Sequence, residues 1–115
     1  MIDLKRSLLV TGFPYNIWKK NKRVIVLFKK FLTAAQGMRR LGSAALDLAW
    51  VASGRFDGFW EEGLNPWDTM AGFLIVEEAG GKMTDYRGRP YRMGSPTLVA
   101  SNGKIHSALV RVTKG

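Results

Sequence analysis

Glu61-Glu62-Gly63-Leu64-Asn65-Pro66-Trp67-Asp68 is the stretch that decides how the surrounding sequence folds. Proline is favoured at the first position of a helix and asparagine is a good N-cap, so a helix is expected to begin at Pro66 with Asn65 as its cap. Asp68 then falls in the first turn, where the helix dipole favours a negative charge. A carboxylate there serves either as an ordinary capping group or as part of a metal or phosphate site, and the spacing leaves both open.

The segments on either side of this stretch predict a strand followed by a helix. Residues 56–60 have strand character, with Phe56, Gly58 and Trp60 on one side, and they deliver Glu61 at the carboxyl end of the strand. Ligand sites of α/β proteins are usually built at such ends. The helix is expected to end at Gly80-Gly81 and to bury the following side chains: Met70, Ala71, Phe73, Leu74 and Val76.

Short apolar strands alternate with helical patterns along the rest of the sequence, which predicts a single α/β unit over residues 1–115 with a mixed sheet and flanking helices. Strands are expected at 7–11, 82–85 and 97–101, with a connector or strand at 38–41. Helices are expected from Asn16 onwards and over 104–112. The first of these helices has an apolar face at helical spacing, made of Val24, Leu27, Phe28, Phe31 and Leu32.

A further helix is expected from Ala44 to Val51, almost wholly buried because only Asp47 interrupts its apolar residues. Ser43 can cap it by accepting a hydrogen bond from the first turn. The small residues Gly42, Ser43 and Ala44 would also let an anion approach the free N–H groups of that turn. Capping and anion binding both remain open on this pattern.

Composition excludes several classes of protein. The 115 residues are 46% hydrophobic and contain no cysteine, so a folded domain without disulfides, thiolate metal sites or a thiol nucleophile is expected. No apolar run is long enough for a membrane span and no signal peptide pattern precedes the first strand. A cytoplasmic location is the expectation that fits these features.

The net charge of +9 favours anionic partners. Eight basic and no acidic side chains lie between Lys19 and Arg40. The segment 19–30 is therefore either a core-facing helix with a solvated cationic side or a surface for nucleic acid or a membrane. Because no aromatic side chains stand among its exposed lysines, the sequence argues against a nucleic-acid surface, and neither nucleic acid nor a membrane is the expected partner.

Few residues offer chemistry. His106 is the single histidine and is expected to lie exposed on the last helix, which leaves no nucleophilic triad and no zinc site. Phosphate-binding glycine motifs are absent. Carboxylates remain, and Asp68 with Glu61 could supply part of a magnesium site, since magnesium prefers oxygen ligands and bridges carboxylates to substrate phosphate. Two carboxylates are too few for a complete site.

At these residues the sequence resembles the inositol monophosphatase family, the magnesium-dependent, lithium-sensitive sugar-phosphate phosphatases. Trp67-Asp68-Thr69-Met70-Ala71-Gly72 followed by Ile75-Val76-Glu77-Glu78-Ala79-Gly80-Gly81 is similar to the family's C-terminal signature. The segments 39–48 and 52–61 match as well, and 8–15 is similar to a family strand. The resemblance implies the C-terminal half of the layered αβαβα sugar-phosphatase fold.

The resemblance also implies roles for individual residues. Asp68 matches the aspartate that binds catalytic Mg²⁺ and touches the substrate, and Glu61 matches the glutamate that bonds substrate hydroxyls. Gly42, Ser43 and Ala44 match the helix start that lines the substrate pocket. The family's other metal ligands, a glutamate and an Asp-Pro-(Ile/Leu)-Asp-Gly-Thr segment, do not occur in this sequence.

Hydrolysis of inositol monophosphate or a related sugar phosphate is therefore the expected activity of the whole enzyme, with this chain alone inactive or nearly so. Its expected partners are a phosphomonoester substrate and either the missing N-terminal half or further copies of itself. Two alternatives stay open: a binding module that uses the basic helix 19–30, and a related phosphatase acting on fructose 1,6-bisphosphate or an adenosine bisphosphate.

Overall fold

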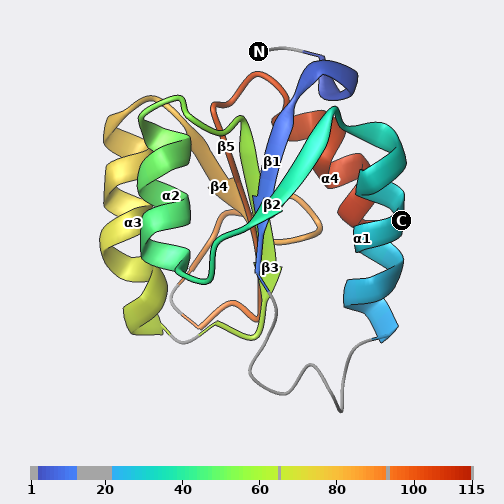
Figure 1. Cartoon of the computed structure of the whole chain (residues 1–115). Helices are drawn as coiled ribbons and strands as arrows, with labels where there is room; N and C mark the ends of the chain where they lie inside the picture. The colour runs from blue at the N-terminus through green and yellow to red at the C-terminus, as the bar shows by residue number, and fades with distance from the viewer. Residues whose placement is uncertain (1–2, 13–21, 65, 93, 115) are drawn as a thin grey trace.

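A five-stranded mixed sheet forms the centre of the computed structural model, which describes residues 3–12, 22–64, 66–92 and 94–114 (Figure 1). The side chains of Pro66 and Asp68 are outside this description. The strands are β1 (Leu8–Thr11), β2 (Gly37–Arg40), β3 (Gly58–Glu62), β4 (Lys82–Thr84) and β5 (Thr97–Ser101). The helices are α1 (Lys22–Ala34), α2 (Ala44–Ala52), α3 (Pro66–Glu78) and α4 (His106–Lys114), with a 3-10 turn at Leu4–Arg6.

The strand order is β2-β1-β3-β5-β4. β1 pairs in parallel with β2 and β3, whereas β5 is antiparallel to both of its neighbours, β3 and β4. The carboxyl ends of β1, β2 and β3 consequently meet at one end of the sheet. The chain leaves β2 and β3 at this end to enter α2 and α3.

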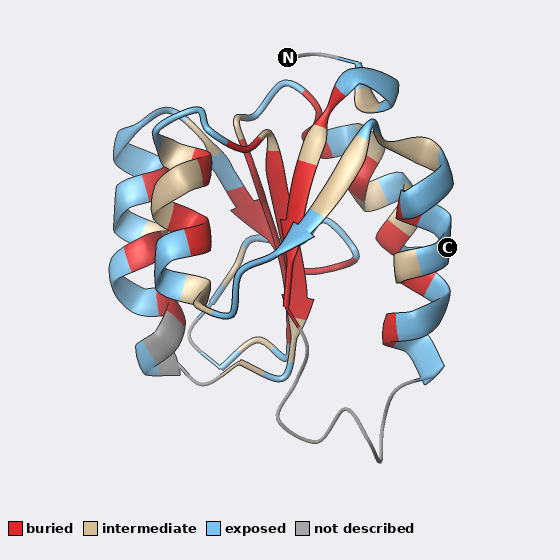
Figure 2. Cartoon of the chain, viewed as in Figure 1, coloured by how far each residue is buried: buried red, intermediate tan, exposed pale blue. Residues whose placement is uncertain are grey.

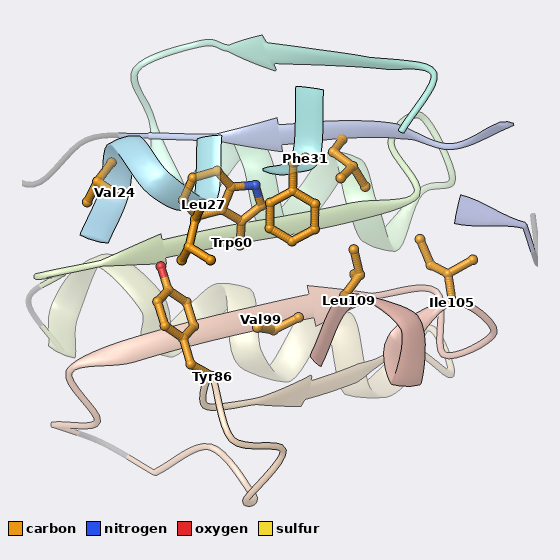
Figure 3. Close-up of a cluster of buried hydrophobic side chains, with 9 residues drawn as sticks. Val24, Leu27, Phe31, Trp60, Tyr86, Val99, Ile105 and Leu109 are labelled. Atoms are coloured by element: carbon orange, nitrogen blue, oxygen red, sulfur yellow. The ribbon is translucent and has the colours of Figure 1, made fainter. Parts of the chain in front are cut away.

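Helices cover both faces of the sheet, so the fold has three layers (Figures 1 and 2). α1 and α4 lie on one face and α2 and α3 on the other. Successive strand residues point to opposite faces, so Trp60 packs with α1 and α4 while Phe59 packs with α2 and α3. The first cluster is shown in Figure 3, where Phe31 of α1 stacks on Trp60 at 5.2 Å between ring centroids. The predicted α/β class with flanking helices is confirmed.

Two expectations about side-chain burial on this first face need correction. Val24, Leu27 and Phe31 are buried as predicted, but Leu32 is 53% exposed because it lies beyond the stripe that contacts the sheet. β3 begins at Gly58, two residues later than expected, and Phe56 packs on the face opposite to Trp60. The amide of Phe56 donates to the Trp50 carbonyl at 3.3 Å, so Phe56 belongs to the turn that ends α2 and strand alternation does not apply to it.

α2 is not almost wholly buried, contrary to the expectation. Leu46 is 50% exposed, while the one charged residue, Asp47, is 1% exposed. The buried side of α2 is set by its contact with the sheet and with α3, and Asp47, Leu48 and Val51 occupy it.

The predicted buried side of α3 is also partly wrong. Thr69, Gly72 and Val76 are buried, whereas Met70 and Leu74 are more than half exposed. A Cβ built on Gly72 would lie 2.4 Å from Leu48 Cδ1, so this glycine is what allows α2 and α3 to pack closely. The close contact fixes the rotation of α3 and turns several of its apolar side chains outward.

The remaining boundaries lie close to the expectations without matching all of them. β2 is a strand rather than a connector, and α4 begins two residues later than predicted. The expected helix start near Asn16 and the Asn65 cap lie outside the described residues. Within the described part of the chain, no helix has the length and apolar character needed to cross a membrane.

Candidate active site at the carboxyl end of the parallel strands

Strand register brings the predicted site residues to one end of the sheet. Arg40, Thr11 and Trp60 lie level across β2, β1 and β3 because Thr11 is the Cα partner of both of the others. Gly12 and Glu61 therefore stand one residue beyond this line. Gly42 follows two residues after Arg40, just before α2 begins.

Glu61 is held against the end of β1. Glu61 is only 6% exposed, and a Cβ built on Gly12 would lie 2.0 Å from Glu61 Oε1. The neighbouring hydroxyl of Thr11 donates to the Trp60 carbonyl at 2.8 Å, which ties β1 to β3 beside it. A buried carboxylate is thus fixed at the strand end where the sequence placed it.

The start of α2 combines a cap with open space. The amide of Leu46 donates to Ser43 Oγ at 3.3 Å, which confirms Ser43 as the N-cap. Gly42 has φ +87°, a left-handed conformation that favours glycine, and no atom lies within 4 Å of a Cβ built there. Because a helix leaves its first N–H groups without intrahelical partners, the amides of Ala44 and Ala45 are suited to an anion.

α3 begins at Pro66 as predicted, which places Asp68 third in the helix. The contact of Leu48 with Gly72 aligns α3 beside α2, and both helices start at the same end of the sheet (Figure 1). The backbone therefore brings Asp68 to the end of the sheet where Glu61 and Ser43 lie. The contacts of its side chain lie outside the described residues.

The described side chains do not by themselves fit a magnesium ion. Among them, no group of three histidine, aspartate or glutamate residues could hold a metal. Magnesium requires near-octahedral oxygen coordination, and Glu62, the carboxylate next to Glu61, is already paired with Arg23. A complete site needs ligands beyond those described.

Asp47 is a buried titratable group whose environment the sequence did not predict. Among the described residues neither of its carboxylate oxygens has a hydrogen-bond partner. Burial raises the pKa of Asp47 to about 6, against the opposing charge of Arg40. A single acid inside an apolar helical run was the signal in the sequence, but that signal does not say which way the side chain faces.

His106 is buried rather than exposed, which corrects the expectation for α4. It is 3% exposed and lies between Thr84 Oγ1, 2.7 Å from Nε2, and Ser101 Oγ, 2.8 Å from Nδ1. Thr84 donates its hydroxyl proton to the Asp85 carbonyl, so it accepts from Nε2–H, and Nδ1 accepts from Ser101. Burial lowers the pKa of His106 to about 4, helped by the charge of Lys82.

This neutral histidine joins β4, β5 and α4 and takes no part in the candidate site. The apolar spacing of α4 alone could not predict that His106 is buried, because its hydrogen-bond partners lie on two strands.

Fold and site together define an α/β protein with a carboxylate and two helix starts at the carboxyl end of parallel strands. The model of the inositol monophosphatase family matches residues 3–114. The chain belongs to the inositol monophosphatase family.

Individual relatives agree with this assignment. The chain is 48% identical to an inositol-1-monophosphatase of Synechocystis, over 93% of this chain and 37% of that relative. It is 45% identical to a putative Nus factor SuhB of Neisseria meningitidis, over 96% of this chain and 42% of the relative. An inositol monophosphatase structure from Anabaena superposes with a TM-score of 0.95 at 46% identity, covering 99% of this chain and 46% of that one.

Proposed function

We propose that this chain forms the substrate-binding part of a Mg²⁺-dependent phosphomonoesterase that hydrolyses inositol monophosphate or a related sugar phosphate. The observation that carries the proposal is the buried carboxylate of Glu61, fixed against Gly12 near the carboxyl end of β3, the end of the sheet at which α2 starts. The likeness to proteins named inositol-1-monophosphatase supports the substrate class.

In this proposal each site residue has a distinct task. Glu61 accepts hydrogen bonds from the hydroxyls of a polyol, which suits a carboxylate whose position is fixed before binding. Gly42, Ser43 and Ala44 line the pocket, with amides of the first turn of α2 directed at the anionic group. Asp68 contributes one carboxylate to the metal and contacts the substrate.

The remaining metal ligands are proposed to come from the part of the enzyme that this chain lacks. The chain spans less than half the length of the relatives described above. When bound, Mg²⁺ would polarise the phosphoryl group and neutralise developing charge. The chain by itself is proposed to bind substrate weakly and to be inactive or nearly so, and the cytoplasm remains its expected compartment.

The outer side of α3 is the proposed contact with this missing part. Four large apolar side chains of α3 are exposed by between 46% and 75% of their surface: Trp67, Met70, Leu74 and Ile75. Exposed apolar side chains at this density on one helix are typical of a surface that another body covers. Self-association of the chain over the same surface is the alternative.

A related substrate within the family, fructose 1,6-bisphosphate or an adenosine bisphosphate, would use the same residues. Comparing phosphate release from the three substrates by the reconstituted enzyme separates these possibilities.

The test is substitution of Glu61 in enzyme reconstituted from this chain and the N-terminal segment of a close relative. Glu61→Gln should raise KM for inositol monophosphate about tenfold or more, since hydrogen bonds to a charged group contribute about 1.5–3 kcal/mol. Glu78→Gln, on the exposed end of α3, is the matched control. Unchanged kinetics for Glu61→Gln would overturn the proposal.

A further inference from the structure

A basic groove lies between α1, the turn after β4 and the end of α4. It has a volume of about 420 Å³, and the cationic side chains that line it are Lys22, Arg23, Lys30, Arg87 and Lys114. These residues come from three separate segments, so the fold gathers a charge that no single segment of the sequence carries. None of the predicted residues of the candidate site lines the groove, although the charges of Glu62 and Glu61 act on the hydroxyl of Tyr86 in its wall.

Most of the positive charge in the groove is uncompensated. Arg23 pairs with Glu62 at 2.6 Å, and its guanidinium lies 5.4 Å from the centre of the Tyr86 ring. The other four cationic side chains form no ion pair within the described part of the chain. Gathering four unpaired cations around one cavity costs mutual repulsion, which an anion in the groove would relieve.

Tyr86 gives the groove a fixed wall. Its amide donates to Thr97 Oγ1 at 2.9 Å, and its carbonyl accepts from Thr113 Oγ1 at 2.8 Å. The side chain extends toward Leu27 and Trp60 (Figure 3). Among the described residues its hydroxyl has no hydrogen-bond partner although Tyr86 is only 4% exposed. A buried hydroxyl without a partner is costly, and a ligand oxygen that reached it would remove that cost.

We propose that this groove binds a small anion carrying two or more phosphate groups, separately from the candidate active site. The volume falls in the range of small-molecule sites, roughly 300–1,000 Å³. Several cations around one concavity suit clustered phosphates. Single-stranded nucleic acid is less well matched, because it requires exposed aromatic rings for base stacking and the aromatic ring of this groove is buried.

The probe is tripolyphosphate, titrated into the whole chain while backbone amide resonances are followed by NMR. The expected shifts gather at Arg23, Lys30, Arg87 and Lys114. Shifts gathered instead at residues 43–46 would place the anion at the start of α2 and overturn the proposal.

Substitutions then test the groove directly. Lys30→Gln with Lys114→Gln should weaken tripolyphosphate binding about tenfold or more, because each substitution removes a cation that can form a charge-assisted hydrogen bond with the anion. Lys29→Gln with Lys104→Gln removes the same charge from exposed positions outside the groove and should change the affinity less than about twofold. If both double variants weakened tripolyphosphate binding equally, the effect would come from the net charge of the chain. That result would contradict a defined binding site in the groove.

Tyr86→Phe is a second, independent test of the groove. The fold should be retained because the hydroxyl has no partner among the described residues, while tripolyphosphate affinity should fall several-fold. If the affinity for tripolyphosphate were unchanged, the Tyr86 hydroxyl would not contact the anion. Binding of a short single-stranded RNA without binding of tripolyphosphate would replace the small anion with nucleic acid. None of these outcomes bears on the role of Glu61, so this inference and the proposed function can fail separately.

Discussion

The carboxylate of Glu61 occupies the space that a side chain on Gly12 would need: a Cβ there would lie 2.0 Å from Oε1 and 2.8 Å from the carboxyl carbon. Strand pairing puts the two residues level at the ends of β3 and β1. The orientation of Glu61 therefore depends on the absence of a side chain at position 12.

Gly12→Ala should displace Glu61 and weaken substrate binding more than it weakens the fold. The atom that clashes is at the end of a side chain, so rotation can relieve part of the overlap, and we expect a stability loss of about 1–2 kcal/mol. In reconstituted enzyme KM for inositol monophosphate should rise by about tenfold, as for Glu61→Gln.

Gly54→Ala, just after the end of α2 and outside the candidate site, is the control for this substitution. It meets no atom within 4 Å but has φ +87°, so it costs stability through backbone strain of about 1–2 kcal/mol. Chemical unfolding of both variants gives the stability, and KM gives the function. If Gly12→Ala left KM unchanged, Glu61 would not be positioned by Gly12.

Gly72→Ala should destabilise the chain although alanine is the better helix former. Alanine gains about 1 kcal/mol in an exposed helix. Here its Cβ would meet Leu48 at 2.4 Å from Cδ1 and 2.7 Å from Cβ, and the second contact cannot be relieved by rotation. A net loss of about 1–3 kcal/mol in urea unfolding is expected. A gain in stability would show that α2 and α3 are not in close contact.

Asp47 and His106 should give opposite pH dependences of stability. The pKa of His106 in the folded chain is about 4, against an ordinary 6.5. The stability that the neutral His106 ring contributes is therefore fully present above pH 6.5 and is lost as the pH falls toward 4. The folded pKa of Asp47 is about 6 against 3.8, so the cost of its charge is fully present above pH 6 and is relieved as the pH falls toward 3.8. Each effect is about 3 kcal/mol, so they largely cancel between pH 4 and 6.

Asp47→Asn separates the two contributions. The variant should be more stable than the parent by about 1–3 kcal/mol at pH 7.5, with the difference disappearing near pH 4. Urea unfolding at a series of pH values measures it, and NMR of the His106 ring should show no titration above about pH 5.5. A stability difference that does not change with pH would mean that Asp47 is charged throughout this range.

The exposed side of α3 should govern association. Met70→Lys with Leu74→Lys changes residues that are 51% and 62% exposed, so the free energy of unfolding should change by less than about 0.5 kcal/mol per site. Light scattering should show less self-association, and reconstitution with an N-terminal segment should fail. Leu32→Lys on α1 is a control of similar exposure. Normal reconstitution by the α3 variant would place the contact elsewhere.

Sequence reasoning identified the elements and the starts of α2 and α3, because the serine cap before Ala44 and the proline at position 66 act locally. It failed where burial depends on a distant partner. Leu48 and Gly72 together decide how α3 is rotated, so the apolar pattern of α3 could not show that Met70 and Leu74 face outward. His106 is buried by Thr84 and Ser101, and the basic groove is assembled from three segments, which no local pattern reveals.

The central claim is that this chain holds the substrate-binding part of the site but lacks a complete set of metal ligands. Phosphate release from inositol monophosphate in the presence of Mg²⁺ tests it most directly, measured for the chain alone and after mixing with the N-terminal segment of a close relative. The account predicts no turnover above background for the chain alone and Mg²⁺-dependent turnover for the mixture. Robust turnover by the chain alone, or none by a mixture that forms a stable complex, would contradict it.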